Sequence, residues 1–140
     1  MTSNETRNET TKLSQENTVL VISPNAQLIQ DVRDFCESNK IKIYEGDPNS
    51  PDVIAVPSRV CIVEKDFMDN KSWNDWVEFL IENKGVDVEQ FIIVILPAPF
   101  SDSLLEEVKK EFEGSTAPIN FIFGSDGTLV VELMKKWMDT

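Results

Sequence analysis

The sequence predicts an α/β fold in which a five-stranded parallel sheet lies between two layers of helices. Short apolar runs alternate along the chain with segments whose apolar residues recur at helical spacing. That alternation is typical of parallel sheets covered by helices on both faces. The predicted strands are 18–22, 40–46, 60–63, 91–96 and 119–123.

The polarity of each strand predicts its place in the sheet. Fully apolar strands belong in the middle of a parallel sheet, and half-polar strands belong at its edges. The half-polar segments are "KIKIYEG" at 40–46 and "INFIF" at 119–123, which contains Asn120. With these two strands at the edges the order is 2-1-3-4-5, so we expect a flavodoxin-like three-layer α/β/α sandwich.

The helical pattern occupies four segments. In the first, Ser23 and Pro24 suit the N-cap and first-turn positions, and Ser72 is the expected start of the second. The predicted helices are 23–39, 72–85, 101–114 and 127–138.

The segment 46–59 departs from this regular pattern. It is barely long enough for a parallel crossover and contains three prolines, so we expect an irregular loop instead of a helix. Without a helix in 46–59, another element must cover the part of the sheet that this helix would have covered. The apolar residues of 72–85, among them Trp73 and Trp76, spread over roughly 200° of the helix surface, and we expect this helix to fill the vacancy.

Composition predicts one acidic domain, 18–140, preceded by a disordered polar tail, 1–17. The net charge of the chain is −12, which would repel nucleic acid and anionic lipid. No apolar run approaches the ~20 residues that span a bilayer, and no signal peptide is evident. Cys36 and Cys61 lie within apolar patterns and read as small buried hydrophobic residues. We therefore expect a cytoplasmic protein that binds neither nucleic acid nor membrane.

The segment 60–98, "VCIVEKDFMDNKSWNDWVEFLIENKGVDVEQFIIVILPA", runs strand, acidic residue, loop, helix, strand. In this order and spacing it resembles the middle of a response-regulator receiver domain. Receivers transfer a phosphoryl group to an aspartate, which requires an acidic pair that holds Mg²⁺, a hydroxyl group and a lysine. The resemblance extends over most of 18–138 but rests on pattern alone.

The residues at the receiver's signature positions lack that chemistry. The acidic pair falls on Ser23 and Pro24 and the acceptor on Glu64. The hydroxyl residue falls on Pro97, or on Leu96 if the alignment shifts by one, and the lysine falls on Gly124. A lone carboxylate holds Mg²⁺ poorly, because the ion needs further oxygen ligands. The resemblance therefore implies a degenerate receiver, or pseudo-receiver, with no catalytic residue, no metal and no cofactor.

Two interpretations of Glu64 follow. Its permanent charge would mimic a phosphorylated aspartate, or it is a solvated strand end. Asp and Glu make up 25 of 140 residues, so composition alone often puts an acid at a given position. The hydroxyl and lysine that would respond to the charge are missing from their expected positions. This favours the solvated strand end.

The last helix, 127–138, is the predicted place for a partner. Its expected core-facing residues are Leu129, Val130, Leu133 and Trp137. A second set widens the apolar stripe to about 200°. That candidate interaction surface consists of Val131, Met134 and Met138. It is either a surface for a protein partner or homodimer, as the receiver resemblance implies for this helix, or part of a well-buried terminal helix.

The expected function is a non-catalytic signalling or regulatory module that acts through protein–protein interaction. The alternative is a small-ligand-binding or enzymatic flavodoxin-like domain that uses the loops at the carboxyl ends of the strands. None of those loops is a glycine loop that cradles phosphate. "GSDGT", 124–128, suits either an anion site or a plain turn and N-cap, and the second is favoured.

Overall fold

The computed structural model describes residues 18–46, 60–82, 91–114 and 119–138, and the predicted strand order is confirmed. All strand pairs are parallel, and the order across the sheet is β2-β1-β3-β4-β5. The strands are β1 (Thr18–Ile22), β2 (Lys42–Glu45), β3 (Val60–Glu64), β4 (Phe91–Leu96) and β5 (Ile119–Phe123).

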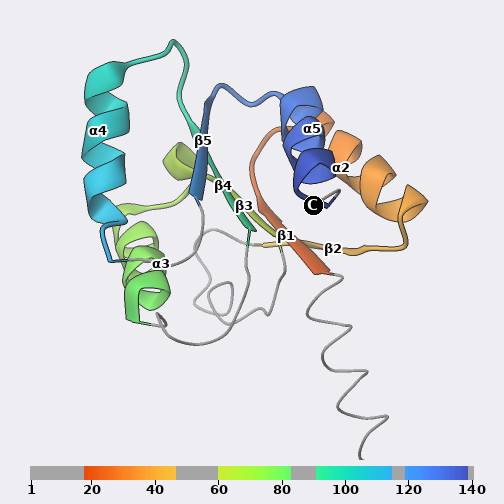
Figure 1. Cartoon of the computed structure of the whole chain (residues 1–140), viewed down its shortest axis with the longest axis horizontal. Coiled ribbons are helices and arrows are strands. Elements are labelled where there is room, and N and C mark those ends of the chain that lie inside the picture. Colours follow the sequence, from red (N-terminus) through yellow and green to blue (C-terminus); the bar gives the residue numbers. More distant parts are fainter. Residues whose placement is uncertain (1–17, 47–59, 83–90, 115–118, 139–140) are drawn as a thin grey trace, which may run out of the picture.

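The helices form a layer on each face of the sheet. In Figure 1, α3 and α4 cover one face and α2 and α5 cover the other. Their bounds are α2 (Ala26–Ser38), α3 (Asn70–Glu82), α4 (Asp102–Glu111) and α5 (Gly127–Met138), with a 3-10 turn η2 (Lys65–Phe67) after β3. The predictions for the polar tail, for the loop after Gly46 and for a helix end at Gly85 fall outside the described residues.

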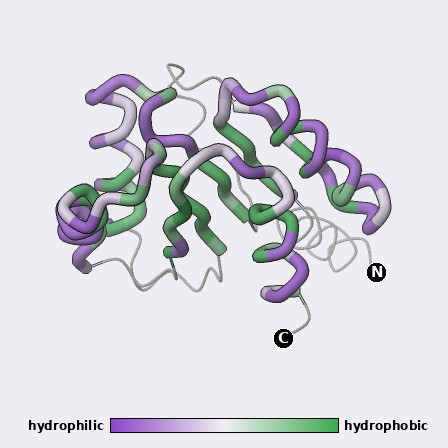
Figure 2. The backbone as a smooth tube through the Cα atoms, turned by 90° about the horizontal axis from the view of Figure 1, so that it is seen from above, coloured by the Kyte–Doolittle hydropathy of each residue, from purple (hydrophilic) through white to green (hydrophobic). Residues whose placement is uncertain are grey.

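The strand side chains build two cores, one on each face, because successive residues of a strand point in opposite directions. Leu20, Cys61 and Ile92 stand side by side in neighbouring strands and belong to the core under α3 and α4. The next residue of each strand, such as Ile62, belongs to the core under α2 and α5. All six residues of β4 are buried, whereas the edge strand β2 is largely exposed. Figure 2 shows apolar strands between helices whose outer faces are polar.

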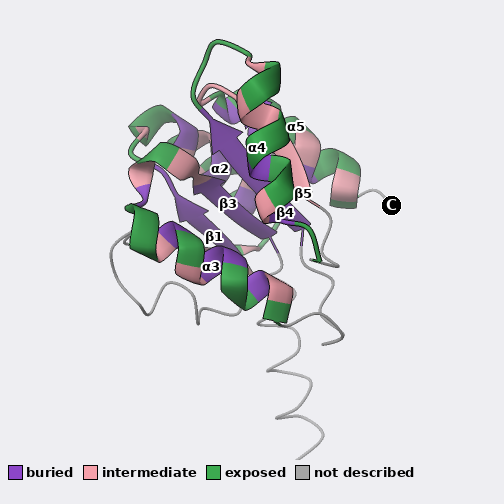
Figure 3. Cartoon of the chain, turned by 90° about the vertical axis from the view of Figure 1, so that its left-hand side faces the viewer, coloured by how far each residue is buried: buried purple, intermediate pink, exposed green. Residues whose placement is uncertain are grey.

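Aromatic side chains join α3 to α4 over the sheet. Trp73 and Trp76 are each 3% exposed and meet the ring of Phe112 edge-on, at centroid distances of 5.7 and 5.9 Å. The indole N–H of Trp73 also donates to Glu111 Oε1 over 3.1 Å. Most of the wide apolar face of α3 is therefore core, as Figure 3 shows by the buried residues along its inner side.

The starts of α2 and α3 differ from the prediction because other side chains provide their caps, whereas α4 and α5 start as predicted. The N-cap of α2 is Asn25, whose Oδ1 accepts the backbone N–H of Leu28 over 3.0 Å. Asp69, not Ser72, caps α3: its Oδ1 accepts the backbone N–H of Ser72 over 2.7 Å. That N–H is the main group that lowers the pKa of Asp69. The stabilisation is therefore present above the unfolded-state pKa and is lost as pH falls through the lower folded-state pKa.

The prediction for α5 is wrong at Met134. Val130 and Met134 are both 0% exposed and form the line of the helix that faces the sheet. Leu129, expected in the core, is 39% exposed. At about 100° per residue, Val131 and Leu133 lie about 80° to either side of the Val130–Met134 line, so they are only half-buried. Of the predicted interaction surface, Val131 and Met138 remain accessible and Met134 does not.

Candidate functional site

The carboxyl edge of the sheet brings together three side chains that are far apart in the sequence. Glu64 is the last residue of β3, Ser23 directly follows β1, and Ser125 lies two residues after β5. Parallel strands end at one edge, which is where open α/β sheets place their binding loops. This cluster includes two of the predicted pocket residues, Ser23 and Glu64, together with Ser125.

Both serine hydroxyls donate to the same carboxylate oxygen of Glu64. The Oγ of Ser23 lies 2.9 Å from Glu64 Oε1, and the Oγ of Ser125 lies 2.5 Å from it. Hydrogen bonds to an ionised acceptor are short and about twice as strong as those between neutral groups. Ser23 is buried and Glu64 is half-buried. Glu64 is therefore a partly exposed strand end with one carboxylate oxygen, Oε1, held by two hydroxyls.

Asn25 fixes the two serines relative to each other. Its backbone N–H donates to Ser23 Oγ over 3.1 Å, so this hydroxyl accepts one hydrogen bond and directs its own proton to Glu64. Its Nδ2 donates to the backbone carbonyl of Ser125 over 3.4 Å. The residue that caps α2 thus also holds the loop before α5.

The other predicted pocket residues contribute backbone shape instead of reactive groups. Pro24 and Pro97 are exposed at this edge. Gly124 has a φ of +94°, which glycine adopts without strain, and its N–H donates to the carbonyl of Leu96 over 2.8 Å. The positive φ turns the chain after β5 and brings Ser125 back towards Glu64.

The hydroxyl group of Ser125 was not predicted. The receiver resemblance implies a hydroxyl residue at Pro97, after β4, whereas the hydroxyl of Ser125 reaches Glu64 from the loop after β5. The sequence feature that could have indicated this hydroxyl is a serine directly after a glycine at the carboxyl end of a strand. Which carboxylate that serine reaches depends on the turn at Gly124, which the sequence pattern does not specify.

The segment "GSDGT" is a turn and helix cap. Asp126 Oδ1 accepts the backbone N–H groups of Thr128 and Leu129, over 3.0 and 3.2 Å. These are the first N–H groups of α5, and an anion at the helix start would compete with Asp126 for them. The favoured interpretation of this loop is thereby confirmed.

Neither a metal-holding cluster nor a reactive thiol is found among the described residues. Within the described residues no group of three or more His, Cys, Asp or Glu side chains is arranged to hold a metal ion. Lys65, next to Glu64, lies over the ring of Trp73, with Nζ 5.1 Å from the ring centroid. Burial raises the pKa of Cys36 to about 11 and that of Cys61 to about 12, so both thiols stay protonated at neutral pH.

Comparison with known proteins gives no family. No family model matches the chain, and no curated protein matches it. No helix in the described part of the chain is long and apolar enough to cross a membrane. The function is therefore argued from the side chains at the carboxyl edge and on the helices.

Removing the Glu64 carboxylate is expected to destabilise the domain. Glu64→Leu leaves two hydroxyls at a half-buried site without their acceptor, and we expect a loss of about 1–3 kcal/mol in the free energy of unfolding. Glu64→Gln keeps an acceptor oxygen and is expected to cost about 1 kcal/mol or less. Urea unfolding measures both, with exposed Asp66→Ala as the control. A Glu64→Leu variant as stable as the control would contradict the role of these bonds.

Proposed function

We propose that the chain is a receiver-like regulatory module that does not accept a phosphoryl group and acts by binding another protein in the cytoplasm. The observation that carries this proposal is the engagement of Glu64 Oε1 by the hydroxyls of Ser23 and Ser125. One oxygen of the carboxylate that the resemblance aligns with the phosphoacceptor is engaged by the protein's own donors.

Phosphoryl transfer needs three things that the surrounding residues do not supply. The attacking carboxylate must be free, Mg²⁺ needs several oxygen ligands, and a cation must neutralise the charge that develops. At the positions implied by the resemblance stand Pro24, Pro97 and Gly124, none with a charged side chain. The neighbouring Lys65 lies over Trp73. The proposal of a non-enzymatic module rests on the lack of metal ligands and of an available cation at these positions.

The internal hydrogen bonds also support a single fixed state of this edge. A phosphoryl group has three strong acceptor oxygens, so adding one at this edge would attract a nearby hydroxyl and shift the loop that carries it. Here the hydroxyl of Ser125 already reaches the carboxylate of Glu64. We infer that the loop after β5 stays in one position, and that regulation comes from presence or absence of a partner.

An amide NMR titration with Mg²⁺ and then beryllofluoride tests the phosphate-inert part of the proposal. We expect no saturable shifts at Ser23, Glu64 or Ser125 at millimolar Mg²⁺, with or without beryllofluoride. Saturable shifts at these residues would overturn it.

A gain-of-binding variant serves as the positive control for this titration. The triple change Ser23→Asp, Pro24→Asp and Glu64→Asp supplies the acidic pair and the shorter acceptor of a working receiver. If its amide spectrum shows a folded domain, it is expected to bind Mg²⁺ with shifts at this edge. A folded triple variant that ignores Mg²⁺ would count against receiver-like geometry.

A further inference from the structure

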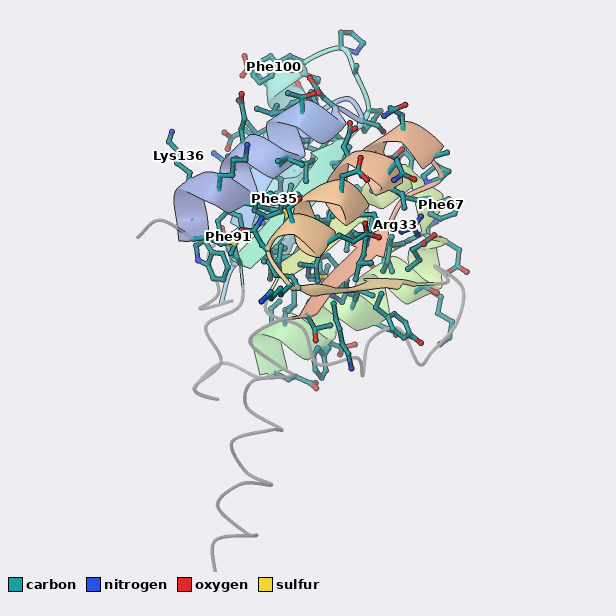
Figure 4. All side chains as sticks on the ribbon, turned by 90° about the vertical axis from the view of Figure 1, so that its right-hand side faces the viewer. Arg33, Phe35, Phe67, Phe91, Phe100 and Lys136 are labelled. Carbon is teal, nitrogen blue, oxygen red and sulfur yellow. The ribbon has the colours of Figure 1, made fainter. Side chains whose placement is uncertain are left out.

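A groove separates α2 from α5 on the face of the molecule away from α3 and α4. Figure 4 shows the two helices side by side, with Phe35 on the side of α2 that faces α5. The groove has a volume of about 770 Å³. Gly127 lets the helices approach closely at one end, since a Cβ there would lie 2.3 Å from Asp31 Oδ2. Ser38 and Met138 line the other end.

Three apolar side chains line the groove. Phe35 and Val131 are half-buried and also touch the core under the two helices, so their positions are fixed from below. Met138 is 44% exposed. Methionine side chains adapt to the shape of an apolar partner. The groove therefore offers apolar contact area that the fold itself leaves uncovered among the described residues.

The charged side chains around this apolar strip are mostly acidic. Asp31 and Asp34 on α2 and Glu132 on α5 face one basic residue, Lys135, which leaves a net charge of −2. Gln27 and Gln30 donate to Asp31 and Asp34, over 2.9 and 2.8 Å. Those donors are neutral amides, which leave the charge in place.

No ion pair within the described residues neutralises the three carboxylates. The nearby basic residue Arg33 pairs with Glu45 of β2 instead. An occupant with positive charge would therefore gain attraction without displacing a charged partner of these carboxylates.

We propose that this groove binds a basic amphipathic helix of a partner protein. The inference rests on the proposed function, because it names the class of partner through which the module would act. Apolar residues three and four positions apart would contact Phe35, Val131 and Met138, and flanking Lys or Arg would meet the acidic walls.

A helix fits this site better than an extended peptide does. The groove is lined by side chains of two helices, so no strand edge is available to pair with an extended backbone. A helix satisfies its own backbone and packs its ridges of side chains between two neighbouring helices. A second copy of this chain fits poorly, since the net charge of −12 makes two copies repel each other.

The test uses a synthetic probe and the full chain. The probe is a fluorescein-labelled 16-residue peptide of leucine and lysine with leucine at helical spacing. The same composition in scrambled order is the control peptide. Binding is measured by fluorescence anisotropy at two salt concentrations and located by amide NMR shifts. We expect shifts in α2 and α5 and an affinity for the helical peptide at least about tenfold above that for the scrambled one.

Two pairs of variants distinguish binding in the groove from unspecific attraction to an acidic protein. Asp34→Lys with Glu132→Lys reverses charge in the groove, and Glu106→Lys with Glu107→Lys makes the same change on exposed residues of α4. We expect the groove variant to weaken binding about tenfold or more and the α4 variant about twofold or less. Met138→Ala is expected to weaken binding more than Leu129→Ala, a similarly exposed residue of α5 outside the groove.

Each other outcome overturns the proposal. Equal weakening by both charge variants would mean unspecific attraction to an acidic protein. Shifts confined to other surfaces would place the site elsewhere. A dimer in sedimentation velocity that the groove variant alone dissociates would identify a second copy as the occupant. Failure here is distinct from failure of the proposed function, because the Mg²⁺ titration reports on Ser23, Glu64 and Ser125, at the carboxyl edge.

Discussion

Met134→Lys is expected to abolish cooperative folding or to lower the free energy of unfolding by about 4 kcal/mol or more. Met134 is 0% exposed and lies in the core between α5 and the sheet, in the same cluster as Val130 and Ile122. An ammonium group there would lose its water without a buried carboxylate to pair with, because Ser23 is the only buried polar or charged residue in the described part of the chain.

Met138→Lys is the matched control, on the same helix and with the same chemical change. Met138 is 44% exposed, so its lysine stays in water and stability is expected to change by about 0.5 kcal/mol or less. Urea unfolding followed by far-UV circular dichroism measures both variants. Equal stability of the two would mean that α5 is rotated from the orientation described here. If Met134→Lys alone abolishes partner binding, the cause is loss of folding. A loss of binding on Met138→Lys, in a folded protein, would instead involve the groove.

Trp73→Ala is expected to destabilise the domain by about 3–5 kcal/mol. The indole is 3% exposed, meets the rings of Trp76 and Phe112, and donates its N–H to Glu111. Truncation leaves a cavity between α3 and α4 and removes the hydrogen bond from the indole N–H to Glu111 of α4.

Trp73→Phe separates packing from hydrogen bonding. Phenylalanine keeps a ring but loses the N–H to Glu111, and we expect a cost of about 1–2 kcal/mol. Asn74→Ala, at an exposed position of the same helix, is the control and should stay within about 0.5 kcal/mol. Circular dichroism in urea is the suitable measurement, because the substitution itself alters tryptophan fluorescence. A Trp73→Ala variant as stable as Trp73→Phe would contradict the core role.

The fold could be predicted because it depends on repeated local signals. The unbroken apolar run of β4 and the alternating polarity of β2 reflect how many faces each strand buries, and that determines central or edge position. The helices could be located from apolar spacing for a similar reason. The starts of α2 and α3 could not, because Asn25 and Asp69 were each one of several possible caps in their loops, whereas α4 and α5 begin where the pattern predicts.

The candidate site could be predicted only in part, and the orientation of α5 shows a related limit. Ser23 and Glu64 both lie at the carboxyl ends of parallel strands, so the topology alone places them at the same edge of the sheet. The contact of Ser125 with Glu64 depends on a positive φ at Gly124, which acts over a single residue. On α5 almost every position up to Met134 is apolar or small, so periodicity alone could not choose between the Val130–Met134 line and its neighbours.

Asn25 has a consequence for how the α2–α5 groove would work. It begins α2 with its Oδ1, and it holds the loop before α5 through its Nδ2 and the carbonyl of Ser125. The starts of both helices are therefore joined by one side chain, in addition to their anchoring on the sheet. The groove walls are preorganised at that end, so a docking helix would lose little affinity to reordering of the protein and would pay mainly for its own immobilisation.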